Sequence, residues 1–362
     1  MWDIFLSYST KDALIAELVK DALRQRSLTV WHDVENIREL DDIPGALSHA
    51  IRQTRLTVLL ISQHHLASRV CQWEALCSLS EGDTAGRDRI ALVLLDDALG
   101  SLSPSLRGRR AIDLRHGEVS AAAEILASHP ALAGPLPGSS DPIIRPFVGL
   151  PGSSGGRFIF RIQLLLEMHS ELSGAMRDAD RGVVAGQRVV ILHGMGGAGK
   201  SSVALFFIEQ FGHSYSNGVA WASIGGDRID NEIGSATDEE LVFRAAVDGL
   251  VGWCRVSDPS RTAALLADLP ADPRSRWAML RDGIGHWLGS GDRLLLVLDD
   301  VPGGMPLEEL LPGRSEGRRT RLPFLLSGRS AFRAQCNMSG GKTGSAGPRF
   351  PQVPFDDPAL PG

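Results

Sequence analysis

Apolar and polar positions alternate in blocks along the first 130 residues, and the blocks follow two different periods. Short, mostly apolar runs are typical of strands buried in a parallel sheet, and they occur at residues 3–8, 28–31, 56–61, 90–95 and 111–114. Stretches with apolar residues at helical spacing lie between them, at residues 13–26, 46–53 and 66–79. Strands that alternate with helices of this length predict βαβ units. We therefore expect a small flavodoxin-like α/β domain with a parallel sheet over residues 1–130.

The second half of the chain shows the same alternation after a change in composition. Residues 131–156 are rich in Pro, Gly and Ser, which predicts an interdomain linker. Further strands are expected at 189–192, 218–222, 294–298 and 322–326, and helices at 158–168, 202–211, 239–251 and 276–288. These elements predict a second α/β domain with a parallel sheet over residues 157–332. Residues 333–362 are again rich in Gly, Ser and Pro and are expected to be disordered.

Composition narrows the classes of partner. The net charge is −6 with 22% charged residues, so no basic field indicates nucleic acid or anionic lipid as a partner. No apolar run approaches the roughly 18 residues of a membrane-spanning helix, and the N-terminus lacks a secretion signal. The four cysteines form no CxxC pair and indicate reduced thiols. We expect a cytoplasmic protein that does not associate with membranes.

A glycine-rich loop carries the clearest chemical signal in the chain. Residues 194–201, with the sequence GMGGAGKS, fit the phosphate-loop pattern G-x-x-x-x-G-K-[ST] at every fixed position. Glycines let successive backbone N–H groups turn toward an anion, and the N-terminus of the next helix points to the same place. Lys200 is expected to reach the β- and γ-phosphates, and the Ser201 hydroxyl to bind Mg²⁺. The predicted nucleotide-binding residues here are Gly194, Gly196, Gly197, Gly199, Lys200, Ser201 and Ser202.

Two acids follow the apolar strand expected at residues 294–298. By themselves Asp299 and Asp300 would be typical of a turn or a helix cap. Ligands of open parallel sheets, however, bind at the carboxyl ends of the strands. We therefore predict that Asp299 binds Mg²⁺ beside Ser201 and that Asp300 contributes to the metal site or polarises an attacking water. ATP (or ADP) and Mg²⁺ are the expected cofactors.

The second half resembles the STAND class of signalling NTPases, which includes the NB-ARC and NACHT-like proteins. Phe147-Val148-Gly149 is similar to the family's adenine-contacting F-V-G-R motif, with Leu150 in place of the arginine. Residues 194–201 match Walker A and residues 295–301 match Walker B. The resemblance implies that Val148 contacts the adenine and that Arg329 approaches the γ-phosphate. Only 33 residues follow Arg329, so the family's helical lid, winged helix and sensor repeats are expected to be missing.

The first domain resembles TIR domains. Residues 3–9 (DIFLSYS) resemble the family's first strand, residues 30–33 (VWHD) its second strand, and residues 68–74 (SRVCQWE) its S-x-W-x-x-x-E segment, with Val70 at the aromatic position. Many bacterial and plant TIR domains cleave the nicotinamide–ribose bond of NAD⁺ with a glutamate on this helix. The resemblance implies that Glu74 is catalytic and stabilises positive charge at the ribose. It also implies a substrate pocket lined by Phe5, Ser7, Tyr8, Trp31 and Asp33.

These resemblances lead to a hypothesis and to alternatives that the sequence leaves open. We expect an immune-type signalling protein in which ATP binding promotes self-association through both domains and activates NAD⁺ hydrolysis. A sensor protein or other TIR proteins are expected partners. Alternatively, Glu74 is a solvated helix carboxylate and the TIR domain is a non-enzymatic adaptor, or the chain is a truncated nucleotide-binding protein. His64 and His65 are interpreted as a polar cap rather than as ligands.

Overall fold

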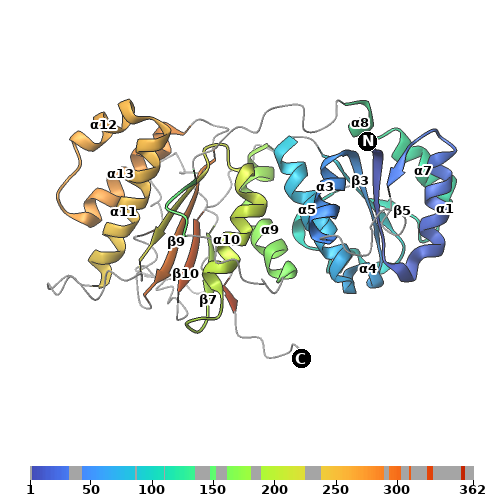
Figure 1. Cartoon of the computed structure of the whole chain (residues 1–362), viewed down its shortest axis with the longest axis horizontal. Coiled ribbons are helices and arrows are strands. Elements are labelled where there is room, and N and C mark those ends of the chain that lie inside the picture. Colours follow the sequence, from blue (N-terminus) through green and yellow to red (C-terminus); the bar gives the residue numbers. More distant parts are fainter. Residues whose placement is uncertain are drawn as a thin grey trace, which may run out of the picture. The chain divides into compact units, whose positions relative to one another are not determined.

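A computed structural model gives the fold of the 362-residue chain. It describes residues 2–31, 43–85, 88–109, 111–134, 147–151, 161–180, 189–224, 238–288, 293–302, 310, 324–328 and 352–354. The chain divides into two compact units. Unit 1 comprises Met1–Ile143 and Phe160–Ser170, and unit 2 comprises Ile144–Ile159 and Glu171–Gly362. Each unit contains a parallel sheet with helices packed against it (Figure 1).

The sheet of unit 1 has the order β2-β1-β3-β4-β5, and its strands pair in parallel. The strands are β1 (Trp2–Ser7), β2 (Val30–Trp31), β3 (Thr54–Ile61), β4 (Ile90–Leu94) and β5 (Ala111–Asp113). Ile4 and Leu6 pack into one core cluster with Val19 and Leu23. Because side chains alternate along a strand, Phe5 faces the other side of the sheet, where its ring stacks on Trp31 at 4.6 Å.

Helices cover both faces of this sheet. They are α1 (Ala13–Arg24), α3 (Ile43–Arg52), α4 (Gln63–Ala67), α5 (Arg69–Ala85), α6 (Pro104–Arg107), α7 (Val119–Ala127) and α8 (Pro130–Ala133), with short 3-10 turns η1 (Thr10–Asp12) and η2 (Asp97–Ser101). Helices α1 and α7 pack together on one side of the sheet, and α3 and α5 on the other (Figure 1). The flavodoxin-like α/β fold predicted for this part of the chain is therefore present.

The helix expected at residues 66–79 is in fact two helices. Ser68 has extended backbone angles and ends α4. Its hydroxyl oxygen then accepts a hydrogen bond from the Cys71 amide at 3.3 Å, as the N-cap of α5. Because the apolar periodicity continues across the break, the sequence pattern gave no indication of it.

Unit 2 contains a sheet of the order β11-β7-β10-β9-β8-β6, again paired in parallel. Its strands are β6 (Phe147–Val148), β7 (Val189–His193), β8 (Val219–Ser223), β9 (Leu295–Val301), β10 (Phe324–Gly328) and β11 (Gln352–Pro354). The helices are α9 (Ile162–Asp180), α10 (Lys200–Phe211), α11 (Asp238–Ser257), α12 (Pro259–Ala267) and α13 (Pro273–Trp287), with a 3-10 turn η3 (Gly212–Ser214). Trp277 and Leu280 of α13 share a core cluster with Phe243 of α11 and with Leu296 of β9. Figure 1 shows α11 and α13 on one side of this sheet and α10 on the other.

Two segments expected to lack regular structure contain short strands. Within the expected linker, Phe147 and Val148 pair with Val219 and Ala220 as the edge strand β6. At Gly149 (φ +80°) an added Cβ would lie 2.2 Å from the carbonyl oxygen of Trp221, so only glycine fits there. Within the expected disordered tail, β11 pairs with Ile191–His193 of β7. These strands are too short to produce a recognisable period in the sequence.

The chain passes from unit 1 to unit 2 after Ile143, inside the expected 131–156 segment, and crosses between the units again after Ile159 and after Ser170. The last of these boundaries lies within α9, since Phe160–Ser170 belongs to unit 1 and Glu171 begins the remainder of unit 2. Among the described helices, none has the length and apolar composition needed to cross a membrane.

Candidate functional site

The glycine-rich loop of residues 194–201 connects β7 to α10. Gly199 adopts a left-handed conformation (φ +90°) at the N-cap of α10, which explains why glycine is needed there. The buried Lys200 side chain turns back over the loop, and its Nζ donates hydrogen bonds to the carbonyl oxygens of Gly194 (3.0 Å) and Met195 (2.8 Å). The loop is thus held in a compact form by its own lysine.

Asp299 of β9 lies beside this loop, although 98 residues separate it from Ser201. The Ser201 hydroxyl donates a hydrogen bond to Oδ1 of Asp299 at 2.9 Å. Ser327 of β10 also donates to the same oxygen. Strand β10 lies between β7 and β9 in the sheet. The carboxyl ends of three neighbouring strands therefore contribute to one site.

A β-bulge brings the second acid to the same site. Leu326 pairs with Leu298 and Gly328 with Val301, so Ser327 alone lies opposite both Asp299 and Asp300. Asp300 has a left-handed backbone (φ +58°), and its amide donates to the Ser327 hydroxyl at 3.0 Å. In a regular strand consecutive side chains point to opposite faces. The bulge removes this alternation locally, and both acids line the same cavity.

This cavity has a volume of about 380 Å³ and combines charged and small residues. Its lining residues are Gly196, Gly197, Gly199, Lys200, Ser201, Ser202, Ser223, Asp299, Asp300 and Ser327. A Cβ added at Gly196, Gly197 or Gly199 would meet no atom within 4 Å. These glycines therefore leave open space beside the loop rather than accommodating another part of the chain. Two carboxylates and one ammonium give the cavity a net negative charge.

The remaining nucleotide-site predictions have different outcomes. Gly194 contributes its carbonyl oxygen to the Lys200 bond. Val148 packs against the core cluster of unit 2 from the edge strand β6 and is not among the residues that line the cavity. Arg329 lies outside the described residues.

Ser223 and Ser327 line the cavity although the sequence analysis did not predict them, because a serine at the end of a strand has no distinctive sequence pattern. Among the described residues, no group of three or more His, Cys, Asp and Glu side chains could hold a metal.

In unit 1, Glu74 lies on α5, as the sequence predicted, and it is only 3% exposed, so the alternative interpretation of Glu74 as a solvated helix carboxylate is wrong. Helix α5 packs against α3, α4, β1 and β4. Phe5 is fully buried under the stacked ring of Trp31. Asp33 lies outside the described residues.

Ser7 and Tyr8 lie at the carboxyl end of β1. The buried Ser7 hydroxyl is 3.2 Å from Nε2 of His65, and Tyr8 is half-buried against the core. The interpretation of His65 as a polar cap is therefore wrong, because Ser62 caps α4 and the His65 ring is buried against Ser7. Burial lowers the pKa of His65 from 6.5 to about 4.

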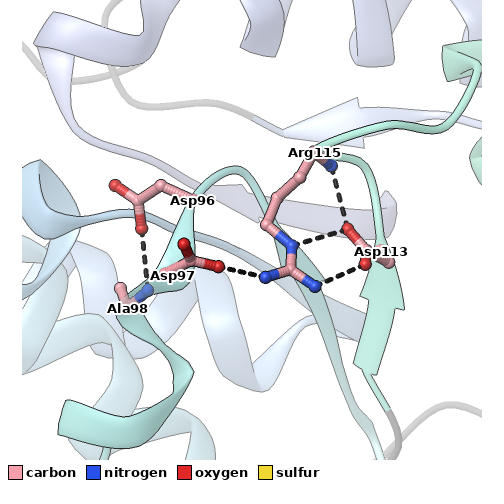
Figure 2. A network of polar contacts seen from close by, with 5 residues as sticks. All are labelled: Asp96, Asp97, Ala98, Asp113 and Arg115. Carbon is pink, nitrogen blue, oxygen red and sulfur yellow. Dashed lines mark hydrogen bonds and ion pairs between the residues drawn. The ribbon is translucent and has the colours of Figure 1, made fainter.

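A charged network joins the carboxyl ends of β4 and β5 (Figure 2). The Arg115 guanidinium donates to both oxygens of Asp113, at 2.9 and 2.6 Å, and pairs with Asp97. These hydrogen bonds from Arg115 lower the pKa of Asp113 to about 2. Asp96 accepts hydrogen bonds from the amides of Ala98 (2.9 Å) and Gln63 (2.8 Å). These contacts thus connect the loops that follow β3, β4 and β5.

Solved structures similar to this chain contain TIR domains. The TIR domain of the Toll-related receptor TRR-2 from Hydra magnipapillata is 15% identical over 35% of this chain and 94% of its own, with a TM-score of 0.30. A TIR-STING receptor from C. gigas is 17% identical over 55% of this chain and 58% of its own, with a TM-score of 0.31. The TIR domains of the activated Roq1 resistosome, which recognises the effector XopQ, are 18% identical over 35% of this chain and 97% of their own, with a TM-score of 0.28.

The search of curated proteins found no match to this chain. The scan against family models matched residues 4–127 to the family described as "TIR domain". This range covers all five strands of the sheet of unit 1 except for residues 2 and 3 of β1. Residues 4–127 of this chain form a TIR domain.

Proposed function

We propose that the chain is an immune-type signalling protein whose second unit binds ATP·Mg²⁺ and thereby controls self-association of a TIR domain that hydrolyses NAD⁺. The observation that carries the proposal is the approach of Ser201 to Asp299, at 2.9 Å, in a cavity that also contains Lys200. A phosphate loop and an acidic strand end are the two elements that nucleotide binding requires. A cytoplasmic location is part of the proposal.

The residues of the loop fit a phosphate group. The open space beside Gly196, Gly197 and Gly199 allows phosphate oxygens to approach the backbone amides and the N-terminus of α10. On binding, the Lys200 ammonium would exchange its bonds to the carbonyl oxygens of Gly194 and Met195 for phosphate oxygens. This exchange replaces neutral acceptors with charged ones, which form stronger hydrogen bonds.

The opposite side of the cavity fits a hard cation. Ser201 and Asp299 present oxygen donors, and Asp300 contributes further negative charge. Because too few acids surround the site to hold a metal by themselves among the described residues, we expect Mg²⁺ to enter with the nucleotide. When bound, the ion would neutralise phosphate charge. Ser327 would keep Asp299 oriented when Ser201 turns toward the ion.

The proposed chemistry of the TIR domain is cleavage of the nicotinamide–ribose bond by water. Glu74 would hold the ribose and stabilise the positive charge that develops at its anomeric carbon. Ser7 and Tyr8, at the end of β1, would contact the substrate with Trp31 and Asp33. Phe5 would act indirectly, since its buried ring supports Trp31.

A second candidate function is a non-enzymatic adaptor. The burial of Glu74 favours it, because a carboxylate that is 3% exposed cannot contact a substrate without a rearrangement. In the enzymatic proposal, self-association of TIR domains provides that rearrangement. The two candidates therefore differ in whether assembled protein consumes NAD⁺.

Two measurements on the full chain test the proposal. Calorimetry should detect ATP binding that requires Mg²⁺ and is lost in Lys200→Ala. Assembled protein should release nicotinamide from NAD⁺, and Glu74→Gln should reduce the rate by about a hundredfold or more. Glu81→Gln is the matched control, since Glu81 lies on the same helix but pairs with Arg52. Binding of ATP without NAD⁺ turnover, at any degree of assembly, would support the adaptor instead.

A further inference from the structure

Ser223 is the last residue of β8, and it lines the cavity of the candidate nucleotide site from the strand next to β9. The residue is exposed. In the part of the chain that the structure describes, its hydroxyl makes no hydrogen bond. The site as described above gives Ser223 no role, although its hydroxyl can both donate and accept a hydrogen bond. We therefore asked what this side chain could bind.

The pairing of β8 with β9 places the Ser223 side chain on the same face of the sheet as Asp299. Ser223 pairs with Asp299, and Ala222 pairs with Leu298. Ala222 and Leu298 belong to the core cluster that also includes residues of α11 and α13. Because side chains alternate along a strand, Ser223 and Asp299 project to the other face, on which α10 lies (Figure 1). The amide of Ile224 donates to the carbonyl oxygen of Asp299 at 2.9 Å and holds the end of β8 beside it.

The Asp299 carboxylate keeps one oxygen for a ligand. The hydroxyls of Ser201 and Ser327 both donate to Oδ1. The other oxygen, Oδ2, accepts no hydrogen bond from the residues that the structure describes. Ser327 is on β10 and Ser223 on β8, so these two serines flank Asp299 from opposite sides of β9. Asp299 Oδ2 and the Ser223 hydroxyl are therefore two oxygens without partners on neighbouring strands.

The charge of the cavity explains why a hydroxyl suits this place better than a third acid. Asp299 and Asp300 already outnumber Lys200. A further carboxylate would repel the triphosphate of ATP. A serine hydroxyl accepts a hydrogen bond without adding charge. Mg²⁺ keeps several of its waters when it binds carboxylates and phosphates, so a cation at this site brings water molecules that need acceptors.

We propose that Ser223 positions the hydrated cation of the ATP complex, because its hydroxyl accepts a hydrogen bond from a cation-bound water beside Asp299. This inference rests on the proposed binding of ATP·Mg²⁺. Neighbouring strands are about 4.8 Å apart, and a hydrogen bond between two oxygens spans about 2.8 Å, so one water can bridge side chains on β8 and β9. Ser223 would thus affect nucleotide affinity through the cation and not through direct contact with phosphate.

Calorimetry on the full chain, with ATP in Mg²⁺ and in EDTA, tests this role. Ser223→Ala should weaken binding by about threefold or more in Mg²⁺ and leave binding in EDTA unchanged. Ser223→Thr keeps the hydroxyl and should bind like the natural protein in both buffers. Ser257→Ala, at the exposed end of α11, is the control and should change neither affinity. The melting temperature of the ligand-free protein should be the same in all three variants, because Ser223 is exposed and its hydroxyl is unpaired.

Ser223→Asp tests the same position with a cation alone. Among the described residues, too few acids surround the site to hold a metal, and this change adds a third carboxylate beside Asp299 and Asp300. Electron paramagnetic resonance of Mn²⁺, without nucleotide, should show binding at least about tenfold tighter than in the natural protein, because affinity rises with the number of charged ligands. Ser257→Asp adds the same charge away from the site and should not increase the affinity for Mn²⁺.

The outcomes separate this inference from the proposed function. ATP binding by the natural protein, combined with an unchanged affinity of Ser223→Ala in Mg²⁺, would overturn the role of Ser223 and leave nucleotide binding intact. An equal loss in Mg²⁺ and in EDTA, weak binding by Ser223→Thr, or no gain of Mn²⁺ binding by Ser223→Asp would also overturn it. Absence of ATP binding by the natural protein in both buffers would overturn the inference and the proposed function together.

Discussion

The Ser327 hydroxyl joins both acids of the candidate nucleotide site: it donates to Oδ1 of Asp299 and accepts from the amide of Asp300. Because of the β-bulge, one serine on β10 lies opposite two residues on β9. The left-handed backbone of Asp300 (φ +58°) is strained for a residue other than glycine. The hydrogen bond from its amide to Ser327 supports this conformation.

Ser327→Ala should destabilise unit 2 and loosen the carboxylate of Asp299. The partly buried amide of Asp300 would lose its acceptor, at a cost of about 1–3 kcal/mol. Differential scanning fluorimetry should show a melting temperature lower by several degrees, at about 2–4 °C for each kcal/mol. Ser223→Ala is the control, since Ser223 is exposed, pairs in register with Asp299 and lines the same cavity. An equal effect of both variants would contradict the role given to Ser327.

Asp299→Asn should abolish the effect of Mg²⁺ on nucleotide affinity while leaving binding in EDTA nearly unchanged. The amide has almost the shape of the carboxylate and still accepts from Ser201, but it lacks the charge that attracts the cation. Calorimetry with ATP in Mg²⁺ and in EDTA should show at least a tenfold difference for the natural protein, about 1.4 kcal/mol, and none for the variant. A variant that keeps the full difference would place the metal elsewhere.

The elements of this site that the sequence predicted depend on strict local spacing. Gly199, Lys200 and Ser201 occupy fixed positions of a motif, and Asp299 ends an apolar strand, so each could be identified without a structure. Ser327 could not be identified, because its role arises from a shift in register between two strands. No local pattern of hydrophobic residues encodes such a shift.

In the TIR domain, too, features encoded by local sequence patterns were predicted, and features that arise from tertiary packing were not. The alternation of strands and helices predicted its sheet, and the resemblance placed Glu74 on α5. Glu74 is buried in the folded domain, where α5 packs against α3, α4, β1 and β4. The contact between Ser7 and His65 joins residues 58 positions apart. Tertiary packing of this kind is not visible in a single sequence.

Arg115→Gln should raise the pKa of Asp113 from about 2 toward its ordinary value of 3.8. A carboxyl whose pKa is lower in the folded state stabilises the protein above its ordinary pKa and loses that contribution as the pH falls. The Asp113 contribution should therefore disappear between about pH 4 and pH 2 in the natural protein. Carboxyl carbon NMR titration measures this pKa directly. Arg52→Gln, which removes a separate ion pair with Glu81, should leave Asp113 at about 2.

His65 should make the free energy of unfolding of the TIR domain decrease as the pH is lowered from 6.5 to about 4. Its imidazole is buried, and its pKa is lowered to about 4. In this range the unfolded chain binds a proton that the folded protein does not, so the stability falls by at most about 1.4 kcal/mol per pH unit. Thermal unfolding at several pH values should show a shallower decline for His65→Gln. The control His64→Gln, at an exposed position, should decline as steeply as the natural protein.

Self-association through the TIR domain should depend on the outer face of α1. Leu14 and Leu18 lie one helical turn apart and are 82% and 51% exposed. A pair of exposed leucines on one helix face is a surface that association would cover. The double change Leu14→Glu and Leu18→Glu should raise the dissociation constant of the assembly by at least about tenfold, as measured by sedimentation.

The control for this double change is Val256→Glu. It introduces a charge at an apolar residue of unit 2 that is 60% exposed. It should leave association through the TIR domain unchanged. If the leucine variant also loses NAD⁺ turnover while keeping its melting temperature and its ATP affinity, assembly and catalysis are linked as proposed. If instead it assembles like the natural protein, the TIR contact uses another surface, and the exposure of Leu14 and Leu18 has no role in assembly.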